Sequence, residues 1–401
     1  MQVIRLSLVF LFVLGFNTLR SEDWPRWRGP NLTGISVEKK WSSTWPEAGP
    51  KVLWKAGVGL GYSSVVVAQG RVYTQGNQQN QDTVFCFDAA TGKEIWKHTY
   101  AEKTAPKYYQ GGTSATPTVD GKVVITVAKS GLTHCLNAET GKVVWKQDVL
   151  KVIGGKYPTW GLAGSALVVG NAVYLNAGSS GVALNKQTGA VLWKSQGGAA
   201  AGYSTPVPYR TQKGFALALY SQKEIVGVDG ATGARLWQYP WVTKYDMNAP
   251  DPIITGRHMF ITSGYGHGCA LLEFTNNGPR KVWENKVMRA QLNGPVLIGS
   301  HLYGIDGDAR RFTLKCVELA TGKEKWKGEN ISALMAADGK LICQGETGEL
   351  FIVAADPGGY KKLAQANIFR EVSWSTPVLA NGRIYCRGSR GSLVCLDVSA
   401  D

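Results

Sequence analysis

The stretch Asp88-Ala-Ala-Thr-Gly92-Lys-Glu-Ile-Trp96 decides the fold, because closely similar nonapeptides return along the chain. Each copy opens with Asp, Asn or Glu and ends with Trp, and most carry Thr-Gly at the centre. The tryptophans that end the copies, including the degraded Glu273-Phe-Thr-Asn-Asn-Gly278-Pro-Arg-Lys-Val-Trp283, are Trp96, Trp145, Trp193, Trp237, Trp283 and Trp326. They are 49, 48, 44, 46 and 43 residues apart. Such a period, with turn signals between short strands, predicts the blades of a β-propeller.

A second repeated element, Thr-Pro followed by an apolar run and a turn, marks where blades begin. It reads Thr116-Pro-Thr-Val-Asp-Gly121 in one copy and Thr376-Pro-Val-Leu-Ala-Asn-Gly382 in another. Pro is tolerated at the start of an edge strand, and Asp-Gly or Asn-Gly supplies the positive φ of a tight hairpin. We therefore expect four antiparallel strands per blade, named A to D from innermost to outermost, with the Trp on strand D.

The repeats add up to eight blades. The expected innermost strands start at Ser63, Ser114, Gly164, Ser204, Ala249, Asn293, Ser332 and Ser375. The last blade lacks an outer strand after Asp397, and Pro50-Lys-Val-Leu-Trp54-Lys55 resembles the missing strand. Closing the ring in this way removes the exposed edges of an open sheet. The sequence thus predicts an all-β, eight-bladed propeller of four-stranded antiparallel blades, closed by an N-terminal strand and spanning residues 50–401.

The N-terminus predicts export. Arg5 precedes an apolar run of 11 residues, Leu6 to Phe16. This run is too short to span a bilayer but suits the core of a signal peptide. We expect residues 1–21 to be that signal peptide and 22–49 an N-terminal extension, with a retained anchor as the alternative. No Cys occurs before Cys86, so no lipid attachment is expected. The expected location is periplasmic or secreted, with no transmembrane segment.

Charge and cysteine content exclude several classes of function. The 44 basic and 29 acidic residues give a net charge of +15, but Lys and Arg are scattered. We expect a solvated basic exterior and no nucleic-acid partner. None of the seven cysteines forms a C-x-x-C motif, and four share a strand context such as Phe-Cys86-Phe. Small buried residues, mostly free thiols, are expected there. Neither a covalent haem motif nor a P-loop is present.

The repeat resembles the pyrroloquinoline quinone (PQQ)-like propeller family, which includes quinoprotein alcohol dehydrogenases and BamB-type assembly factors. The segment Asp23-Trp-Pro-Arg-Trp-Arg-Gly-Pro30 is similar to the leader of exported propellers of planctomycete-type bacteria. The BamB resemblance implies a non-catalytic binding or scaffolding module. The quinoprotein resemblance implies PQQ with calcium and a catalytic Asp. Classical dehydrogenases of the family are longer and carry a vicinal Cys pair, which this chain lacks. The first function is therefore the prediction and the second the alternative.

Binding residues are expected on one face of the ring. Because strands alternate in direction, D-to-A and B-to-C connections share one face (the loop face), while the Thr-Gly and Asp-Gly turns lie on the other (the turn face). The loop face is expected to gather aromatic, amide and basic side chains, namely Tyr62, Lys107, Tyr109, Trp160, Tyr203, Asn248, Arg289, Asn293, Arg370 and Trp374. They suit an anionic small ligand, a peptide or a protein. Alternatively, the aromatic rings simply plug the channel mouth.

Other residues are given structural or secondary roles. The repeat tryptophans are expected to pack between blades, and these are Trp54, Trp96, Trp145, Trp193, Trp237, Trp283 and Trp326. If the chain were a dehydrogenase, the candidate acids would be Asp246, Asp306 and Asp308. His267 and Cys269 share a strand face but lack a third ligand, so no metal site is predicted. We expect no catalytic residue, no bound cofactor and a monomer.

Overall fold

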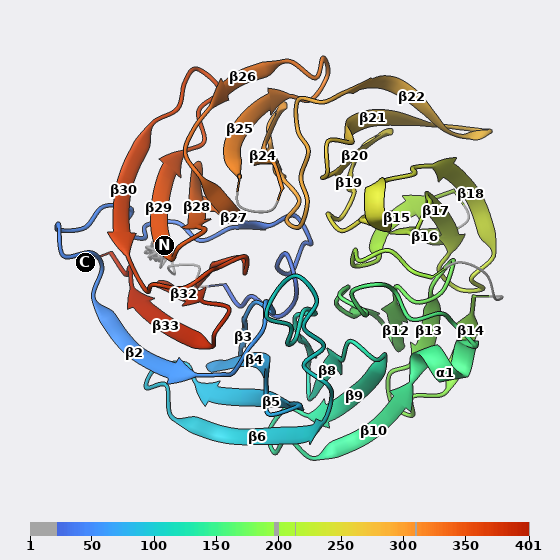
Figure 1. Ribbon diagram of the computed structural model, residues 1–401, viewed down its shortest axis with the longest axis horizontal. Helices are drawn as coiled ribbons and strands as arrows, with labels where there is room; N and C mark the ends of the chain where they lie inside the picture. The colour runs from blue at the N-terminus through green and yellow to red at the C-terminus, as the bar shows by residue number, and fades with distance from the viewer. Residues whose placement is uncertain (1–21, 196–199, 213, 309–310, 401) are drawn as a thin grey trace, which may run out of the picture.

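Eight sheets surround a common axis in the computed structural model, which describes residues 22–195, 200–212, 214–308 and 311–400 (Figure 1). The predicted eight-bladed all-β propeller is confirmed. Helix in the described residues is limited to α1 (Val149–Ile153) and the 3₁₀ turn η1 (Lys244–Asp246). Neither is long and apolar enough to cross a membrane. The signal peptide predicted for residues 1–21 lies outside the described residues.

Each blade is an antiparallel meander. From the inside outward, blades 1 to 4 contain β3 (Val66–Ala68), β4 (Arg71–Gln78), β5 (Gln81–Asp88) and β6 (Glu94–Ala101); β7 (Thr118–Asp120), β8 (Val123–Val127), β9 (Leu132–Asn137) and β10 (Val143–Asp148); β11 (Leu167–Val169), β12 (Ala172–Leu175), β13 (Val182–Asn185) and β14 (Val191–Lys194); and β15 (Val207–Thr211), β16 (Gly214–Tyr220), β17 (Glu224–Asp229) and β18 (Arg235–Pro240). Blades 5 to 8 contain β19 (Ile253–Thr255), β20 (His258–Ser263), β21 (Gly268–Thr275) and β22 (Gly278–Asn285); β23 (Val296–Ile298), β24 (His301–Asp306), β25 (Thr313–Glu318) and β26 (Glu324–Lys327); β27 (Ile331–Ala337), β28 (Lys340–Gly345), β29 (Glu349–Ala354) and β30 (Lys362–Asn367); and β31 (Val378–Ala380), β32 (Arg383–Arg387), β33 (Ser392–Asp397) and β2 (Val52–Gly57).

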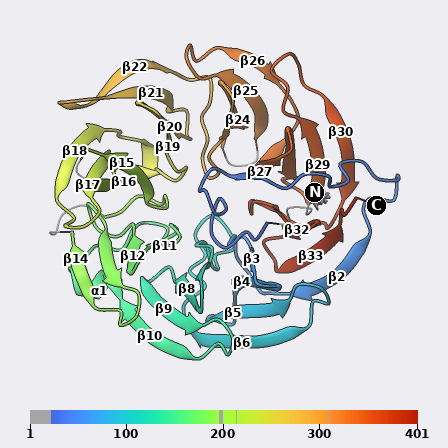
Figure 2. The same cartoon turned by 180° about the vertical axis from the view of Figure 1, so that it is seen from behind.

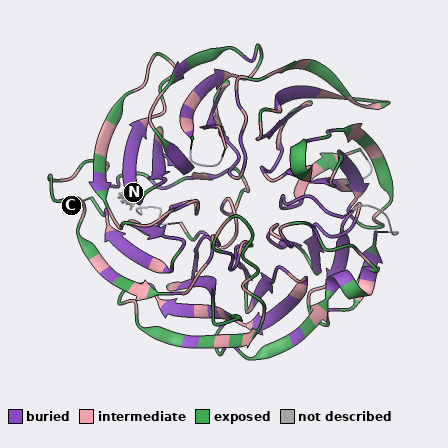
Figure 3. Cartoon of the chain, viewed as in Figure 1, coloured by how far each residue is buried: buried purple, intermediate pink, exposed green. Residues whose placement is uncertain are grey.

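The ring closes as predicted. Strand β2 pairs antiparallel with β33, and Trp54 lies opposite Cys395. The blue strand β2 therefore forms the outer strand of the red, C-terminal blade (Figure 1). Buried residues concentrate on the inner strands, whereas strand D of each blade is largely exposed (Figure 3). All seven cysteines are buried and unpaired.

The repeated motif joins neighbouring blades. Most repeat tryptophans donate their indole N–H to a backbone carbonyl of the next blade, over 2.7–3.0 Å, in the pairs Trp54–Ala89, Trp96–Ala138, Trp145–Lys186, Trp193–Gly230, Trp283–Leu319 and Trp326–Asp356. The turn glycine makes this possible. Gly92 has a φ of 71°, and a Cβ there would lie 2.5 Å from the Trp54 ring. Trp237 differs, because it donates to Tyr209 of its own blade.

The N-terminal extension crosses the channel on the turn face, which the sequence did not predict (Figure 2). Trp24 forms a bridge with Val67 of blade 1. Pro25 O accepts a bond from the backbone N–H of Val119 in blade 2. Strand β1 (Ile35–Ser36) then adds in parallel to β27, the innermost strand of blade 7. The extension therefore closes one end of the channel and leaves the other end open to the loop face.

Candidate functional site

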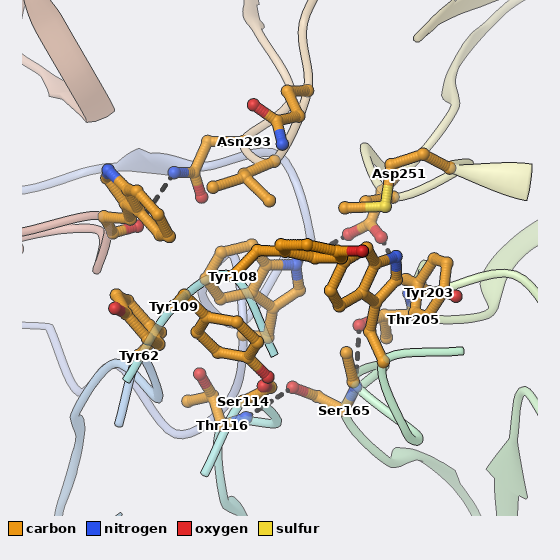
Figure 4. A pocket seen from close by; sticks show the side chains of 18 of the residues that line it. Tyr62, Tyr108, Tyr109, Ser114, Thr116, Ser165, Tyr203, Thr205, Asp251 and Asn293 are labelled. Carbon is orange, nitrogen blue, oxygen red and sulfur yellow. Dashed lines mark hydrogen bonds between the residues drawn. The ribbon is translucent and has the colours of Figure 1, made fainter. Parts of the chain in front are cut away.

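A cavity of ≈ 250 Å³ occupies the axis of the ring on the loop face (Figure 4). Its base is formed by Trp27 of the extension and by residues at the start of the innermost strands. The lining residues are Trp27, Tyr62, Lys107, Tyr108, Tyr109, Ser114, Thr116, Trp160, Ala163, Ser165, Tyr203, Thr205, Met247, Ala249, Asp251, Tyr265, Gln291, Leu292, Asn293 and Trp374. The propeller thus brings residues from most blades, far apart in sequence, into a single pocket.

Seven of the ten residues predicted for the site line this cavity. They are Tyr62, Lys107, Tyr109, Trp160, Tyr203, Asn293 and Trp374. The common reason is topological, since D-to-A connections and the first residues of inner strands converge on the axis.

A chain of hydrogen bonds around the axis fixes the base of the cavity. The backbone N–H of Ser64 donates to Oγ1 of Thr116 over 3.0 Å, and that of Thr116 donates to Oγ of Ser165 over 2.9 Å. Ser165 donates in the same way to Oγ1 of Thr205 over 3.0 Å, and Thr205 donates to Oδ1 of Asp251 over 2.8 Å. Five successive blades are thereby linked through one position of the repeat.

Asp251 is the acid of the cavity and was missed from the sequence. It precedes Pro252 in the position that Thr116 and Thr205 hold in other blades. An Asp in place of this repeated Thr was the feature of the sequence that could have identified it. Besides the bond from Thr205, its Oδ2 accepts the indole N–H of Trp27 over 2.7 Å. No ion pair within 4.0 Å involves Asp251 in the described part of the chain. Burial raises the pKa of Asp251 to about 6, although the positive charge of Arg28 opposes this shift.

Aromatic rings form the walls. Tyr62 stacks on Trp374 with 4.8 Å between ring centroids and an interplanar angle of 21°. Tyr109 lies 5.6 Å from Tyr62 and 6.2 Å from Trp160, so the four rings form a continuous surface. The Nζ atom of Lys107 lies 5.4 Å from the centroid of the Trp160 ring. The wall is therefore largely aromatic, and Lys107 lies against it in a cation–π contact.

Tyr109 also connects the cavity to a buried cation. The Tyr109 hydroxyl is hydrogen-bonded to the ammonium group of Lys129, which lies 4.6 Å from the ring centroid. Burial lowers the pKa of Lys129 to about 8, despite the opposing charges of Asp82 and Glu102. Lys129 contacts the Tyr109 ring but does not itself line the cavity.

The remaining three predicted residues lie elsewhere. Asn248 is buried, and its amide donates to the backbone oxygens of Ser221, Gln222 and Trp241, so it shapes a loop. Arg289 forms a two-pronged hydrogen bond with Asp306, with both distances at 2.8 Å. Arg370 is exposed and does not line the cavity. Lys107 is therefore the one basic side chain among the lining residues of the described chain.

The acids considered for a dehydrogenase are also outside the cavity. Asp246, Asp306 and Asp308 do not line it. Burial opposes ionisation of Asp306, but hydrogen bonds from Arg289 and Lys315 prevail and lower its pKa. Asp306 forms salt bridges with these two residues, at 2.8 and 2.9 Å.

The donor set of the cavity fits calcium poorly. Calcium takes six to eight oxygen ligands. Asp251 is the one carboxylate among the described lining residues, and both of its oxygens already accept hydrogen bonds. In the described residues no group of three or more His, Cys, Asp or Glu side chains could hold a metal. His267 packs edge-on against Trp241 at 4.3 Å between centroids.

Comparison with known proteins identifies the family. The model of the family described as outer membrane protein assembly factor BamB matches residues 38–113 and 80–328. No curated protein sequence matches the chain. BamB from Moraxella catarrhalis is similar in structure, with a TM-score of 0.64 and 14% identity over 87% of this chain and 98% of that one.

Quinoprotein enzymes share the fold. The quinohemoprotein alcohol dehydrogenase from Comamonas testosteroni has a TM-score of 0.68 and 14% identity over 94% of this chain and 81% of that one. A europium-containing methanol dehydrogenase has a TM-score of 0.67 and 12% identity, over 94% and 89% of the two chains. These identities establish a common fold and no more. The sequence match, in contrast, covers most of the chain, which therefore belongs to the outer membrane protein assembly factor BamB family of β-propellers.

Proposed function

We propose that this chain is an exported, non-catalytic binding module whose axial cavity receives a ligand or a side chain of a partner protein. The observation that carries the proposal is the cavity itself, open on the loop face and closed at its base by Trp27. Binding sites for small groups are characteristically concave and mostly apolar, with a few convergent polar groups. Family membership supports the same reading, because the family is described by its role in assembly.

The chemistry of the cavity narrows what can bind. Tyr62, Tyr109, Trp160 and Trp374 offer rigid rings that lose little conformational entropy when they bind. One base, Lys107, and one buried acid, Asp251, are the ionisable groups besides tyrosine that line the cavity in the described residues. The sequence predicted an anionic ligand because it placed three basic residues on the loop face. Two of them, Arg289 and Arg370, do not line the cavity. We therefore favour an aromatic or aliphatic group, such as a side chain of a partner protein.

A site-specific cross-linking experiment tests this function. Tyr108 lines the cavity and is 94% exposed, whereas Leu192 lies on an outer strand and is 53% exposed. The photoreactive amino acid p-benzoylphenylalanine is placed at either position of the full chain, exported in a bacterial host, and irradiated. We expect a discrete protein adduct from position 108 and none from 192. The adduct from position 108 should disappear when Trp160→Ala and Trp374→Ala are combined.

Titration with PQQ and calcium addresses the dehydrogenase alternative, which the shared fold keeps open. The expected result is no saturable change in the absorbance of PQQ and no oxidation of alcohols with a dye as electron acceptor. Stoichiometric, calcium-dependent binding with such activity would overturn the proposal. Equal cross-linking from positions 108 and 192 would also contradict it, because the adduct would then not depend on the cavity.

A further inference from the structure

The junction between blades 4 and 5 has a repeat tryptophan but lacks the hydrogen bond by which the other repeat tryptophans join neighbouring blades. Trp237 occupies the position of the repeat tryptophan, yet its indole N–H donates to the Tyr209 hydroxyl of its own blade over 2.7 Å. The equivalent residue of the preceding blade, Trp193, donates to the backbone of Gly230 in the next blade. Trp237 is also more exposed than Trp193. The aromatic side chain is thus available at the surface of blade 4.

The degraded repeat of blade 5 explains this difference. In blade 1, Ala89 offers its carbonyl at the start of a compact Thr-Gly turn. The corresponding residue of blade 5 is Phe274, and there β21 and β22 continue as a long hairpin to Thr275 and Gly278. Phe274 instead stacks on Tyr209, with 5.2 Å between centroids and an interplanar angle of 13°. Three aromatic residues therefore cluster where a turn would otherwise cover Trp237.

A groove of ≈ 1160 Å³ opens beside this cluster on the turn face. Tyr209, Trp237 and Phe274 line it, together with Gln212, which follows β15, and Gly256, which follows β19. Its charged lining residues are Arg28, Arg210 and Arg257, and in the described chain no Asp or Glu lines it. Arg257 shares Glu273 with Arg280, whereas no ion pair within 4.0 Å involves Arg210 in the described residues. The lining of the groove therefore combines an aromatic cluster with arginine side chains.

The innermost strands beside the groove have free edges. In blade 7 the edge of β27 is covered by β1, which pairs with it in parallel. In blade 1 the edge of β3 is covered by Trp24. Strands β15 and β19 both line the groove, and among the described residues no backbone hydrogen bond joins either of them to the extension. The pairing of β1 with β27 shows how an extended segment adds to an innermost strand. The edge of β19 is open to the same kind of pairing, whereas β15 contains Pro208, which has no N–H to donate.

We propose that this groove docks an extended peptide segment of a partner protein that carries apolar side chains next to Asp or Glu. Its backbone adds to the edge of β19, in the mode known as β-augmentation. Its apolar side chains pack against the cluster around Trp237, and its carboxylates face Arg210 and Arg257. The groove lies on the face opposite to the axial cavity, so this inference does not depend on the proposed function.

Selection from a phage-displayed library of random peptides on the immobilised full chain tests the inference. We expect the enriched peptides to combine aromatic or aliphatic residues with Asp or Glu. Fluorescence anisotropy of a labelled selected peptide should show an affinity at least about tenfold lower for Leu236→Asp and for Arg210→Glu. Leu236 is 49% exposed and lines the groove. Methylation of alternate backbone amides of the peptide should weaken binding as well, because β-augmentation uses those N–H groups.

Leu192→Asp is the matched control. Leu192 precedes Trp193 as Leu236 precedes Trp237, and it is similarly exposed at 53%, but it does not line the groove. This variant should bind the peptide as the unaltered chain does. Enrichment of basic peptides, or equal affinity for Leu236→Asp and Leu192→Asp, would overturn the inference. A dimer that Leu236→Asp dissociates, without peptide binding, would overturn it too by assigning the groove to a second copy of the chain.

Discussion

The indole N–H of Trp27 donates a hydrogen bond of 2.7 Å to Oδ2 of Asp251 and so ties the N-terminal extension to blade 5 at the base of the cavity. We expect Trp27→Phe to lower the free energy of unfolding by about 1.5–3 kcal/mol, the usual contribution of a hydrogen bond to a charged group. Denaturant unfolding measures this change. Trp45→Phe is the control, because Trp45 donates to Gln365 at an exposed site. Equal effects of the two substitutions would contradict a special role for the bond to Asp251.

Asp251 should make the stability of the protein depend on pH. Its pKa in the folded chain is about 6, above the ordinary value, because burial disfavours the charged carboxylate. Between about pH 4 and 6 the folded state therefore binds more protons than the unfolded state. Stability from this group is complete below that range and is lost as the pH rises through 6. Two pKa units correspond to about 2.7 kcal/mol, which is an upper limit here.

Asp251→Asn tests this dependence, because the amide does not titrate. The free energy of unfolding of the variant, relative to the unaltered chain, should rise as the pH increases from 4 to 7. Measuring the difference between the two proteins removes the contribution of other titrating groups, such as Asp82. A difference that stays constant over this range would show that Asp251 does not titrate with a raised pKa.

The turn glycine of the repeat should be more sensitive to substitution than an equivalent glycine elsewhere. Gly92 and Gly70 have φ values of 71° and 72°, so Ala at either position is strained by about 1–2 kcal/mol. A Cβ at Gly92 would lie 2.5 Å from the Trp54 ring, whereas a Cβ at Gly70 would meet nothing within 4 Å. Gly92→Ala should therefore destabilise the chain by a further 1–3 kcal/mol or so. Thermal unfolding of both variants gives the comparison, and equal losses would argue against the packing explanation.

The architecture was predictable from sequence because the repeat is a local pattern. Trp54 could be placed next to Cys395 because a single strand was missing from a countable set. The path of the extension could not be predicted in this way. Trp27 reaches Asp251 across 224 positions of sequence, and nothing in the local pattern around Trp27 specifies that contact. Asp251 was missed for a related reason. It replaces the Thr of the Thr-Pro element, and this change points to a functional site only once the innermost strands are known to converge on the axis.

The basic residues show the same limit. Lys107, in a long connection between blades, lines the cavity. Arg289 does not, because its guanidinium group is hydrogen-bonded to Asp306 at the end of β24. The sequence assigns both residues to loop-face connections, but it does not reveal which of the two basic side chains already has an acidic partner. A position in a loop-face connection is thus not sufficient to bring a basic side chain into the cavity, because a nearby acid such as Asp306 can bind it first.

The two repeat tryptophans of blades 3 and 4 should differ in what they contribute to stability. Trp193 is buried and donates across the blade junction to Gly230. Trp193→Ala should therefore cost about 3–5 kcal/mol, as for large core residues. Trp237 is partly exposed and bonded within its own blade, so Trp237→Ala should cost less by at least about 1 kcal/mol, a typical net value for one hydrogen bond. Chemical denaturation of the two variants measures the difference. If Trp237→Ala proved as destabilising as Trp193→Ala, the missing hydrogen bond across the junction would not weaken the contribution of Trp237, and its contact with Phe274 of blade 5 would be the stronger explanation.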